Sequence, residues 1–157
     1  MQVSKMMRTN VVTVSPDTPF RELLRMQACM ASRQIHVVDE DRKMLGIITS
    51  YDLLNALAPF YIDSNLARAL PDDVSVVRHA YEASKEKTAR DIMTPLVASL
   101  RPSDHFVEAE TLIREKGGNV LPVVDDDGRL LGEITRKTIV KYLALDVLGV
   151  SCEGKEG

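Results

Sequence analysis

The chain has 157 residues, 45% of them apolar, and a net charge of −3 at pH 7, with acidic and basic residues interspersed. This length suits one compact domain or two small packed ones, and the charge balance argues against nucleic acid as a partner. There is no apolar run of roughly 18 residues, as a membrane span needs, and no signal-peptide run follows Lys5 and Arg8. We therefore expect a cytoplasmic protein with no membrane partner.

The first 58 residues predict the order strand, helix, strand, strand, helix. The expected elements are Val11–Val14, a helix from about Pro19 to Ala31, the apolar runs Ile35–Val38 and Leu45–Thr49, and a closing helix from about Ser50 to Ala58. Asp17 or Thr18 is expected to cap the first of these helices.

The same order returns after a shift of 86 residues. Met6–Ala58 aligns with Ile92–Ala144 without a gap and with 15 identities in 53 pairs, where composition alone would give roughly three. In the second copy the expected elements are Val97–Leu100, a helix from about Ser103 to Lys116 capped by Ser103 or Asp104, Leu121–Val124, Leu130–Thr135, and a helix from about Arg136 to Leu145. Asp127-Gly128 predicts a hairpin turn between the last two strands.

The segment between the copies, Pro59–Ala89, is too long for a simple turn. Asp72-Asp73 followed by apolar residues at helical spacing predicts one extra helix. Its apolar side chains cover either this protein's own surface or a partner, and the former is favoured. We therefore divide the chain into a first repeat (1–58), a linker (59–89), a second repeat (90–145) and a flexible tail (146–157).

Two runs carry a family resemblance. The first is Ile35-His36-Val37-Val38-Asp39 followed by Leu45-Gly46-Ile47-Ile48-Thr49-Ser50-Tyr51-Asp52-Leu53, and the second is Leu121-Pro122-Val123-Val124-Asp125 followed by Leu131-Gly132-Glu133-Ile134-Thr135. Together with Asp91-Ile92-Met93-Thr94-Pro95, which opens the second copy, they resemble the cystathionine-β-synthase (CBS) domain, present here as a tandem pair. His36 departs from the usual proline, which Pro122 retains.

The resemblance implies an α+β fold, close to α/β, in which two β-α-β-β-α repeats pack through their sheets about a pseudo-twofold axis. It also implies two clefts between the repeats that bind adenosine nucleotides or S-adenosylmethionine in many members, and a homodimer. No obligatory cofactor is expected. An adenine nucleotide or S-adenosylmethionine would act as a regulatory ligand.

Asp52 is the foremost candidate for binding that ligand. It lies in the first turn of a helix, three residues after Thr49, where its carboxylate could accept hydrogen bonds from both vicinal hydroxyls of a ribose. The Thr49 hydroxyl and the helix-start N–H groups suit a phosphate or ribose oxygen. The same spacing is also that of a helix capping pair, and the two roles can coexist.

The resemblance supplies further candidates for this cleft. Ile47 and Leu96-Val97-Ala98 would hold the adenine by apolar contact. Arg33 and Lys137 would pair with phosphates, although each could equally be a solvated surface charge. Asn119 follows two glycines in a helix-terminating turn, and a contact to the phosphates is the alternative to a role in that turn alone.

The second corner departs from the family's motif. Thr138 stands where the first copy has Asp52, and Glu133 stands where it has Ile47. A carboxylate without a partner would be costly to desolvate there and would oppose a phosphate. We therefore expect a weak or empty second site near Val11, Val12, Thr135 and Thr138.

Other chemistry finds little support. The three histidines are dispersed without metal-ligand spacing, and Cys29 and Cys152 are expected to be free thiols. Repeats and linker account for nearly the whole sequence, and no catalytic motif is present, so we expect no enzyme. Two hypotheses remain: a sensor that binds an adenosyl ligand and signals to an effector protein, or a structural dimerisation module that binds no ligand.

Overall fold

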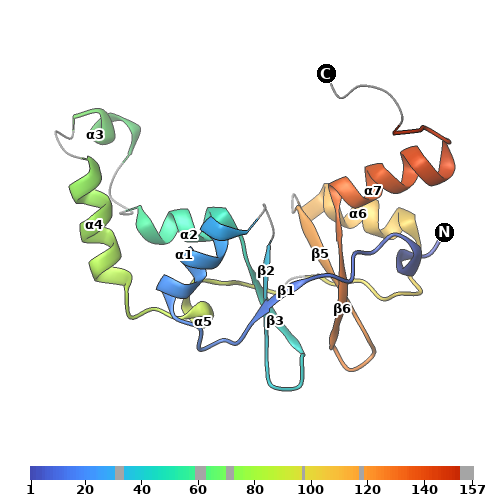
Figure 1. Ribbon diagram of the computed structural model, residues 1–157, viewed down its shortest axis with the longest axis horizontal. Coiled ribbons are helices and arrows are strands. Elements are labelled where there is room, and N and C mark those ends of the chain that lie inside the picture. The colour runs from blue at the N-terminus through green and yellow to red at the C-terminus, as the bar shows by residue number, and fades with distance from the viewer. Residues whose placement is uncertain (31–33, 59–62, 70–72, 97, 117–118, 153–157) are drawn as a thin grey trace. The chain divides into compact units, whose positions relative to one another are not determined.

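The computed structural model describes residues 1–30, 34–58, 63–69, 73–96, 98–116 and 119–152 (Figure 1). These residues form two compact units. Unit 1 comprises Met1–Val11 with Val97–Gly157, and unit 2 comprises Val12–Leu96. The compact units therefore do not coincide with the sequence repeats at their N-terminal ends. The opening segment of each repeat belongs to the unit that contains the other repeat's hairpin.

Unit 2 has a four-stranded sheet in the order β1-β2-β3-β4. Its strands are β1 (Val12–Val14), β2 (Ile35–Val38), β3 (Met44–Ile48) and β4 (Thr94–Pro95). β1 runs parallel to β2, and the other two pairings are antiparallel. The helices are α1 (Phe20–Cys29), α2 (Ser50–Leu57), α3 (Ser64–Ala69), α4 (Asp73–Ser84) and α5 (Ala89–Ile92).

The core of unit 2 is aliphatic apart from Phe20, which is fully buried. Alternate residues Ile35 and Val37 of β2 point to one face of the sheet, where they pack with Phe20 and Leu23 of α1 and with Leu53 of α2. All four residues of β2 are buried, so both faces of this strand are covered. Burial on both faces explains why β2 is a continuous apolar run except for His36.

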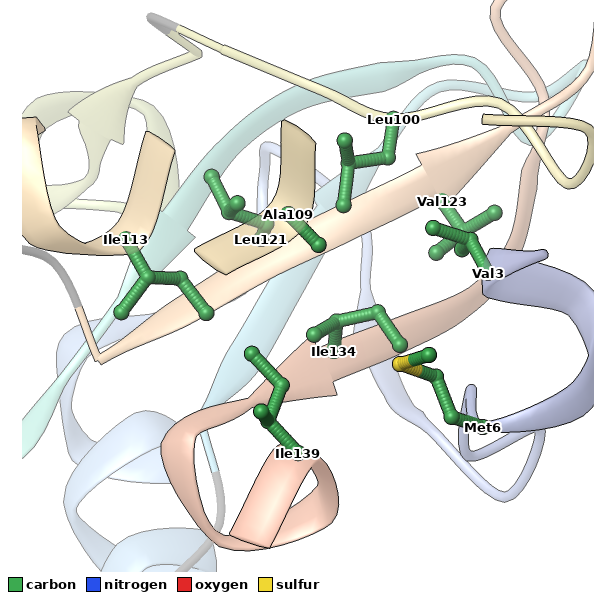
Figure 2. Close-up of a cluster of buried hydrophobic side chains, with 9 residues drawn as sticks. All are labelled: Val3, Met6, Leu100, Ala109, Ile113, Leu121, Val123, Ile134 and Ile139. Carbon is green, nitrogen blue, oxygen red and sulfur yellow. The ribbon is translucent and has the colours of Figure 1, made fainter. Parts of the chain in front are cut away.

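Unit 1 contains the same hairpin and helices in the second copy. Its elements are η1 (Val3–Lys5), α6 (Phe106–Lys116), β5 (Val120–Val124), β6 (Leu130–Thr135), α7 (Arg136–Tyr142) and the π-helical turn η2 (Leu143–Val147). Figure 2 shows the core of this unit, where Val3 and Met6 from the N-terminal segment lie with Ile134 and Ile139. The first residues of the chain thus complete the core of the unit that holds the second repeat.

Each opening segment crosses a glycine of the other repeat's hairpin. Gly46 of β3 pairs with Pro95 of β4, and a Cβ at Gly46 would lie 2.6 Å from the carbonyl oxygen of Thr94. Gly132 of β6 is crossed likewise by Arg8, whose carbonyl oxygen would lie 2.7 Å from an added Cβ. Both glycines are therefore required by close backbone approach.

The two hairpin turns share one hydrogen-bonding arrangement. Asp39 Oδ1 accepts from the backbone N–H groups of Asp41 and Lys43, both at 2.9 Å, and Asp125 Oδ1 accepts in the same way from the second turn. The left-handed position of this turn is occupied by Arg42 (φ 63°) in one copy and Gly128 (φ 83°) in the other. The aspartate therefore fixes the turn even where the glycine of the motif is missing.

Most predicted elements of the repeats are confirmed, with shifts of one to three residues at their ends. The cap predicted at Asp17 or Thr18 is wrong, because Pro19 is the N-cap of α1. The Phe20 N–H donates to the Lys87 carbonyl at 3.0 Å. A backbone carbonyl therefore accepts the hydrogen bond that a capping side chain would otherwise accept.

In the second copy Val97 is outside the described residues, and Leu100 makes an isolated parallel bridge with Val123 in place of a strand. The described residues of the linker form two helices, α3 and α4, where one was predicted. Ala80 of α4 is buried and Tyr81 packs on Phe20, whereas Val74 and Val77 are exposed. The prediction that this helix covers the protein's own core is therefore confirmed for the C-terminal half of α4.

Candidate functional site

Asp52 and Thr49 close a capping box at the start of α2. Asp52 Oδ2 accepts from the Thr49 backbone N–H at 2.8 Å and from the Thr49 hydroxyl at 3.1 Å, while Thr49 Oγ1 accepts from the Asp52 N–H at 3.3 Å. Sequence favours this cap because Thr followed three residues later by an acidic residue satisfies two orphan N–H donors reciprocally. One carboxylate oxygen of Asp52 is therefore used by the cap.

The other carboxylate oxygen makes a contact that is not part of the cap. Thr94 Oγ1 of β4 donates to Asp52 Oδ1 at 3.0 Å, between residues 42 positions apart. Asp52 is half-buried and Thr94 is exposed, so the pair lies at the surface of unit 2. Asp52 Oδ1 and the Thr94 hydroxyl thus form an accessible polar edge beside the strand that carries Ile47.

A second capping box in the same unit provides an internal comparison. Asp91 Oδ2 accepts from the Thr88 N–H at 2.9 Å and from the Thr88 hydroxyl at 3.2 Å, nearly the values at Asp52. The hydrogen bonds from Thr88 lower the pKa of the Asp91 carboxyl below its usual value. The contact of Oδ1 with Thr94 distinguishes Asp52 from this ordinary cap.

Four described residues among those predicted to bind the ligand lie in unit 2. Asp52, Thr49 and Ile47 are close in sequence, and Ile47 is half-buried on β3, opposite Thr94 in the strand register. Leu96 is exposed, and its N–H donates to the Leu45 carbonyl at 3.2 Å, so it continues along the edge of β3. Arg33 and Val97 lie outside the described residues.

Three further residues predicted for this site belong to unit 1. Ala98 is half-buried against the core of that unit, whereas Asn119 and Lys137 are exposed. Val11 also belongs to unit 1, and Val12 to unit 2; both are half-buried.

Thr135 and Thr138 cap α7 in the way that Thr49 and Asp52 cap α2. Thr138 Oγ1 accepts from the Thr135 N–H at 2.8 Å and donates to the Thr135 carbonyl at 2.9 Å. The carboxylate of the first corner is replaced by a hydroxyl that is engaged locally. Beside it lies a hollow of about 350 Å³, lined by Thr138 together with Lys5, Arg8, Lys141 and Asp146 among others.

Glu133 has a partner that was not predicted from the sequence. Its side chain is 2% exposed and forms an ion pair with Arg8, whose Nε donates to Glu133 Oε1 at 2.8 Å. The backbones of the two residues also exchange hydrogen bonds, each at 2.8 Å. The expectation of a carboxylate without a partner is therefore wrong, because the crossing N-terminal segment brings Arg8 to β6.

Sequence reasoning missed Thr94 and Arg8, which occupy equivalent positions 86 residues apart. A signal was present. Aligning the copies shows that Arg8 replaces Thr94 and Glu133 replaces Ile47, and two opposite charges gained together indicate a contact. Each of these residues lies in the opening segment of one repeat and contacts the hairpin, or the helix that follows it, of the other.

Metal chemistry has no support among the described residues, which contain no cluster of three or more potential ligands. His36 is fully buried on β2, and His79 and His105 are exposed. Cys29 and Cys152 are both exposed free thiols. Within the described part of the chain, no helix is both long and apolar enough to span a membrane.

Comparison with known families identifies the fold. The sequence model of the CBS domain matches residues 3–59 and again residues 89–145. The chain belongs to the CBS domain family. Its two copies form a tandem pair, and the mixed helix-and-strand fold is that of solved CBS pairs.

Two curated relatives illustrate the breadth of the family. The CBS domain-containing protein CBSX2, chloroplastic, of Arabidopsis thaliana is 29% identical over 140 residues, which are 85% of this chain and 59% of CBSX2. Inosine-5'-monophosphate dehydrogenase of Aquifex aeolicus is 34% identical over 133 residues, 84% of this chain and 22% of the dehydrogenase. The chain thus spans less than two thirds of these relatives, and in the second the matching region is part of an enzyme.

Among solved structures, CBSX2 in complex with AMP superposes with a TM-score of 0.72 at 27% identity, covering 94% of this chain and 98% of that one. MJ1225 of Methanocaldococcus jannaschii, a putative archaeal homologue of γ-AMPK, has a TM-score of 0.74 at 26% identity and covers 94% of this chain and 51% of that one. Both likenesses extend over nearly the whole chain.

Proposed function

We propose that this chain is a regulatory module that binds an adenosine-containing ligand at the corner formed by Asp52 and Thr49. The observation that carries the proposal is the Asp52 carboxylate, which caps α2 through Oδ2 and presents Oδ1 at the surface beside β3. The AMP complex of CBSX2, similar over nearly the whole chain, supports AMP as the first ligand to test. ADP, ATP and S-adenosylmethionine share its adenosyl group.

In this proposal each candidate residue has a defined role. Asp52 and Thr49 bind the ribose, charge-assisted hydrogen bonds to the carboxylate being the stronger ones. Apolar contact with the adenine comes from Ile47, Leu96, Val97 and Ala98. Arg33, Lys137 and Asn119 hold phosphates, an arrangement that would favour a nucleotide over neutral adenosine.

The second corner, near Val11, Val12, Thr135 and Thr138, is proposed to bind adenosyl ligands weakly or not at all. Thr138 uses its hydroxyl in the cap of α7, and the neighbouring strand carries the ion pair of Glu133 with Arg8. We therefore expect a stoichiometry of one ligand per chain.

The proposed output is a shift in population. A ligand changes the conformation of the module only by binding one arrangement more tightly than another, and an effector protein then reads the arrangement that is favoured. We propose that the module itself is non-catalytic, works as a homodimer and acts in the cytoplasm. The mass in solution, measured with and without ligand, tests the dimer.

Calorimetric titration of AMP, ADP, ATP and S-adenosylmethionine tests the proposal. Wild-type protein is expected to bind one of them saturably at about one site per chain. Asp52→Asn keeps an oxygen for the cap but removes the charge, and should weaken binding at least tenfold, since hydrogen bonds to charged groups contribute about 1.5–3 kcal/mol. Asp91→Asn, the same change in the other capping box, should leave binding unchanged.

A non-binding dimerisation module is the alternative, and Thr138 and Glu133 at the second corner are the residues that favour it. It predicts a constitutive dimer and no heat of binding with any of the four ligands, in protein free of co-purified nucleotide. Equal loss of binding in Asp52→Asn and Asp91→Asn would show that the Asp52 carboxylate acts through the cap of its helix and does not bind the ligand.

A further inference from the structure

The hollow of about 350 Å³ in unit 1 is formed by two segments that are distant in sequence. The N-terminal segment and the helical end of the unit contribute Lys5, Met6, Met7, Arg8, Thr138, Lys141, Tyr142 and Asp146. Both segments belong to unit 1, so the hollow is formed within one compact unit. Among the described residues, its lining shares only Thr138 with the predicted second corner.

The apolar side chains that line the hollow are fixed by the core of unit 1. Met6 is buried in that core, where Figure 2 shows it beside Ile134. Met7 and Tyr142 are half-buried and pack against the same cluster. The organic part of a ligand would therefore contact side chains that are already positioned, which reduces the entropy lost on binding.

Three cationic side chains, those of Lys5, Arg8 and Lys141, line the same hollow. Lys5 and Lys141 are exposed, and within the described part of the chain no acidic group pairs with either ammonium. Arg8 donates from Nε and from one Nη to Glu133. Since a guanidinium has five N–H donors, three of them remain for another acceptor. The hollow thus offers two ammonium groups and part of a guanidinium to an anion.

The first copy of the repeat lacks these charges. At the positions of the three cations it has Asp91, Thr94 and Asn55. The cations are therefore specific to unit 1, and the ion pair with Glu133 involves Arg8 alone. Because like charges that line one hollow repel each other, an anion bound between them is stabilised by all of them.

A phosphate suits these donors better than a carboxylate does. A phosphomonoester carries a charge of about −1.5 to −2 at pH 7 and three acceptor oxygens. Lysine binds phosphate as a point charge, and arginine binds it through paired N–H donors. Asp146 opposes an anion at the same hollow, so the larger charge of a phosphate matters. We propose that the hollow binds a small phosphomonoester, its phosphate at Lys5, Arg8 and Lys141 and its organic part against Met7 and Tyr142.

Calorimetric titration of phenyl phosphate, which has a phosphate and an apolar ring but no adenosyl group, tests this site. Wild type should bind it saturably and more tightly than inorganic phosphate or benzoate. Lys5→Gln combined with Lys141→Gln should weaken binding about three- to tenfold, and Asp146→Asn should strengthen it about twofold, as expected for exposed charges. The control Lys116→Gln, an exposed lysine of unit 1 outside the lining, should match wild type.

The outcomes separate this site from the adenosyl site. Asp52→Asn should bind phenyl phosphate as wild type does, and the double lysine variant should keep the AMP affinity of wild type. The proposal is overturned, with the adenosyl site unaffected, if wild type does not bind phenyl phosphate or if the double lysine variant binds it equally well. Loss of phenyl phosphate binding in Asp52→Asn would place the phosphate at the adenosyl site and also overturn it. Unchanged urea midpoints show that the lysine variants are folded.

Discussion

The ion pair of Arg8 with Glu133 allows a quantitative test of how the N-terminal segment is held in unit 1. Arg8→Thr places at this position the residue found at the equivalent position of the second copy, Thr94, and removes the guanidinium from a carboxylate whose side chain is 2% exposed. Breaking a buried ion pair on one side costs about 3–5 kcal/mol. Because the Arg8 side chain is 33% exposed, water can partly replace it, and we expect the lower end, about 3 kcal/mol.

Glu133→Ile introduces the first copy's residue at the partner position. Alone it removes the buried charge and leaves Arg8 able to reach solvent, so the change should be small. In the double variant the pair becomes the Thr and Ile that unit 2 has as Thr94 and Ile47. Replacing a buried ion pair by groups without charge is often neutral or stabilising. The double-mutant cycle should therefore give a coupling of about 2 kcal/mol or more.

Urea unfolding of the four proteins measures these free energies, with unchanged m-values showing that the same surface is exposed. A loss of 3 kcal/mol corresponds to a fall in Tm of about 6–12 °C for a chain of this size. Arg25→Ala, at the exposed ion pair with Glu22 on α1, is the control and should be indistinguishable from wild type. A decrease below about 1 kcal/mol for Arg8→Thr, or additive effects in the cycle, would refute the assignment of a buried, coupled pair.

Three further predictions concern the framework. Gly46→Ala would place a Cβ 2.6 Å from a carbonyl oxygen of β4 and should lower stability by about 1–3 kcal/mol in urea unfolding; an unchanged midpoint would show that the crossing is looser than described. Ile134→Ala, in the core of unit 1, should lower the free energy of unfolding by about 2–5 kcal/mol, whereas the exposed Val140→Ala should change it little, and equal effects would contradict the burial. Backbone hydrogen bonds lower the pKa of Asp125, so its carboxylate contributes stability that is present above its ordinary pKa of 3.8 and lost as pH falls through the lowered value. In Asp125→Asn the free energy of unfolding should therefore fall less steeply with decreasing acidic pH than in the control Asp17→Asn. The same pH dependence in both variants would exclude this role of Asp125.

Local patterns in the sequence were sufficient for the elements of each repeat. The run Ile35–Val38 is apolar because both faces of β2 are buried, and its bounds follow from that run alone. Likewise, the Thr49 and Asp52 cap follows from spacing within one helical turn. In both cases the structure depends on neighbours in the chain, which a single sequence displays directly.

Contacts between distant segments could not be predicted in the same way. Arg8 meets Glu133 across 125 positions and Thr94 meets Asp52 across 42, and neither contact follows from periodicity. Both arise because each opening segment crosses the other repeat's glycine, an exchange that depends on tertiary packing. The linker was likewise predicted as one helix, whereas its described residues form α3 and α4.

The internal repeat makes the divergence of the two corners interpretable, because each corner serves as the other's reference. Glu133 without Arg8 would bury a lone negative charge, and Arg8 without Glu133 would replace the hydroxyl of Thr94 by a group that cannot accept a hydrogen bond. Glu133 is therefore tolerable only together with Arg8, and the two residues replace the hydroxyl-and-apolar pair of Thr94 and Ile47 by an ion pair. Under the proposed function, the corner whose opening segment is held by this ion pair is also the corner that lacks the carboxylate for a ribose. Arg8→Thr with Glu133→Ile alone should consequently not create a second site, because Thr138 still lacks the carboxylate, whereas adding Thr138→Asp should raise the AMP stoichiometry above one in calorimetry. A stoichiometry of one in that triple variant, folded as judged by its urea midpoint, would show that the ribose contacts are insufficient to build the site.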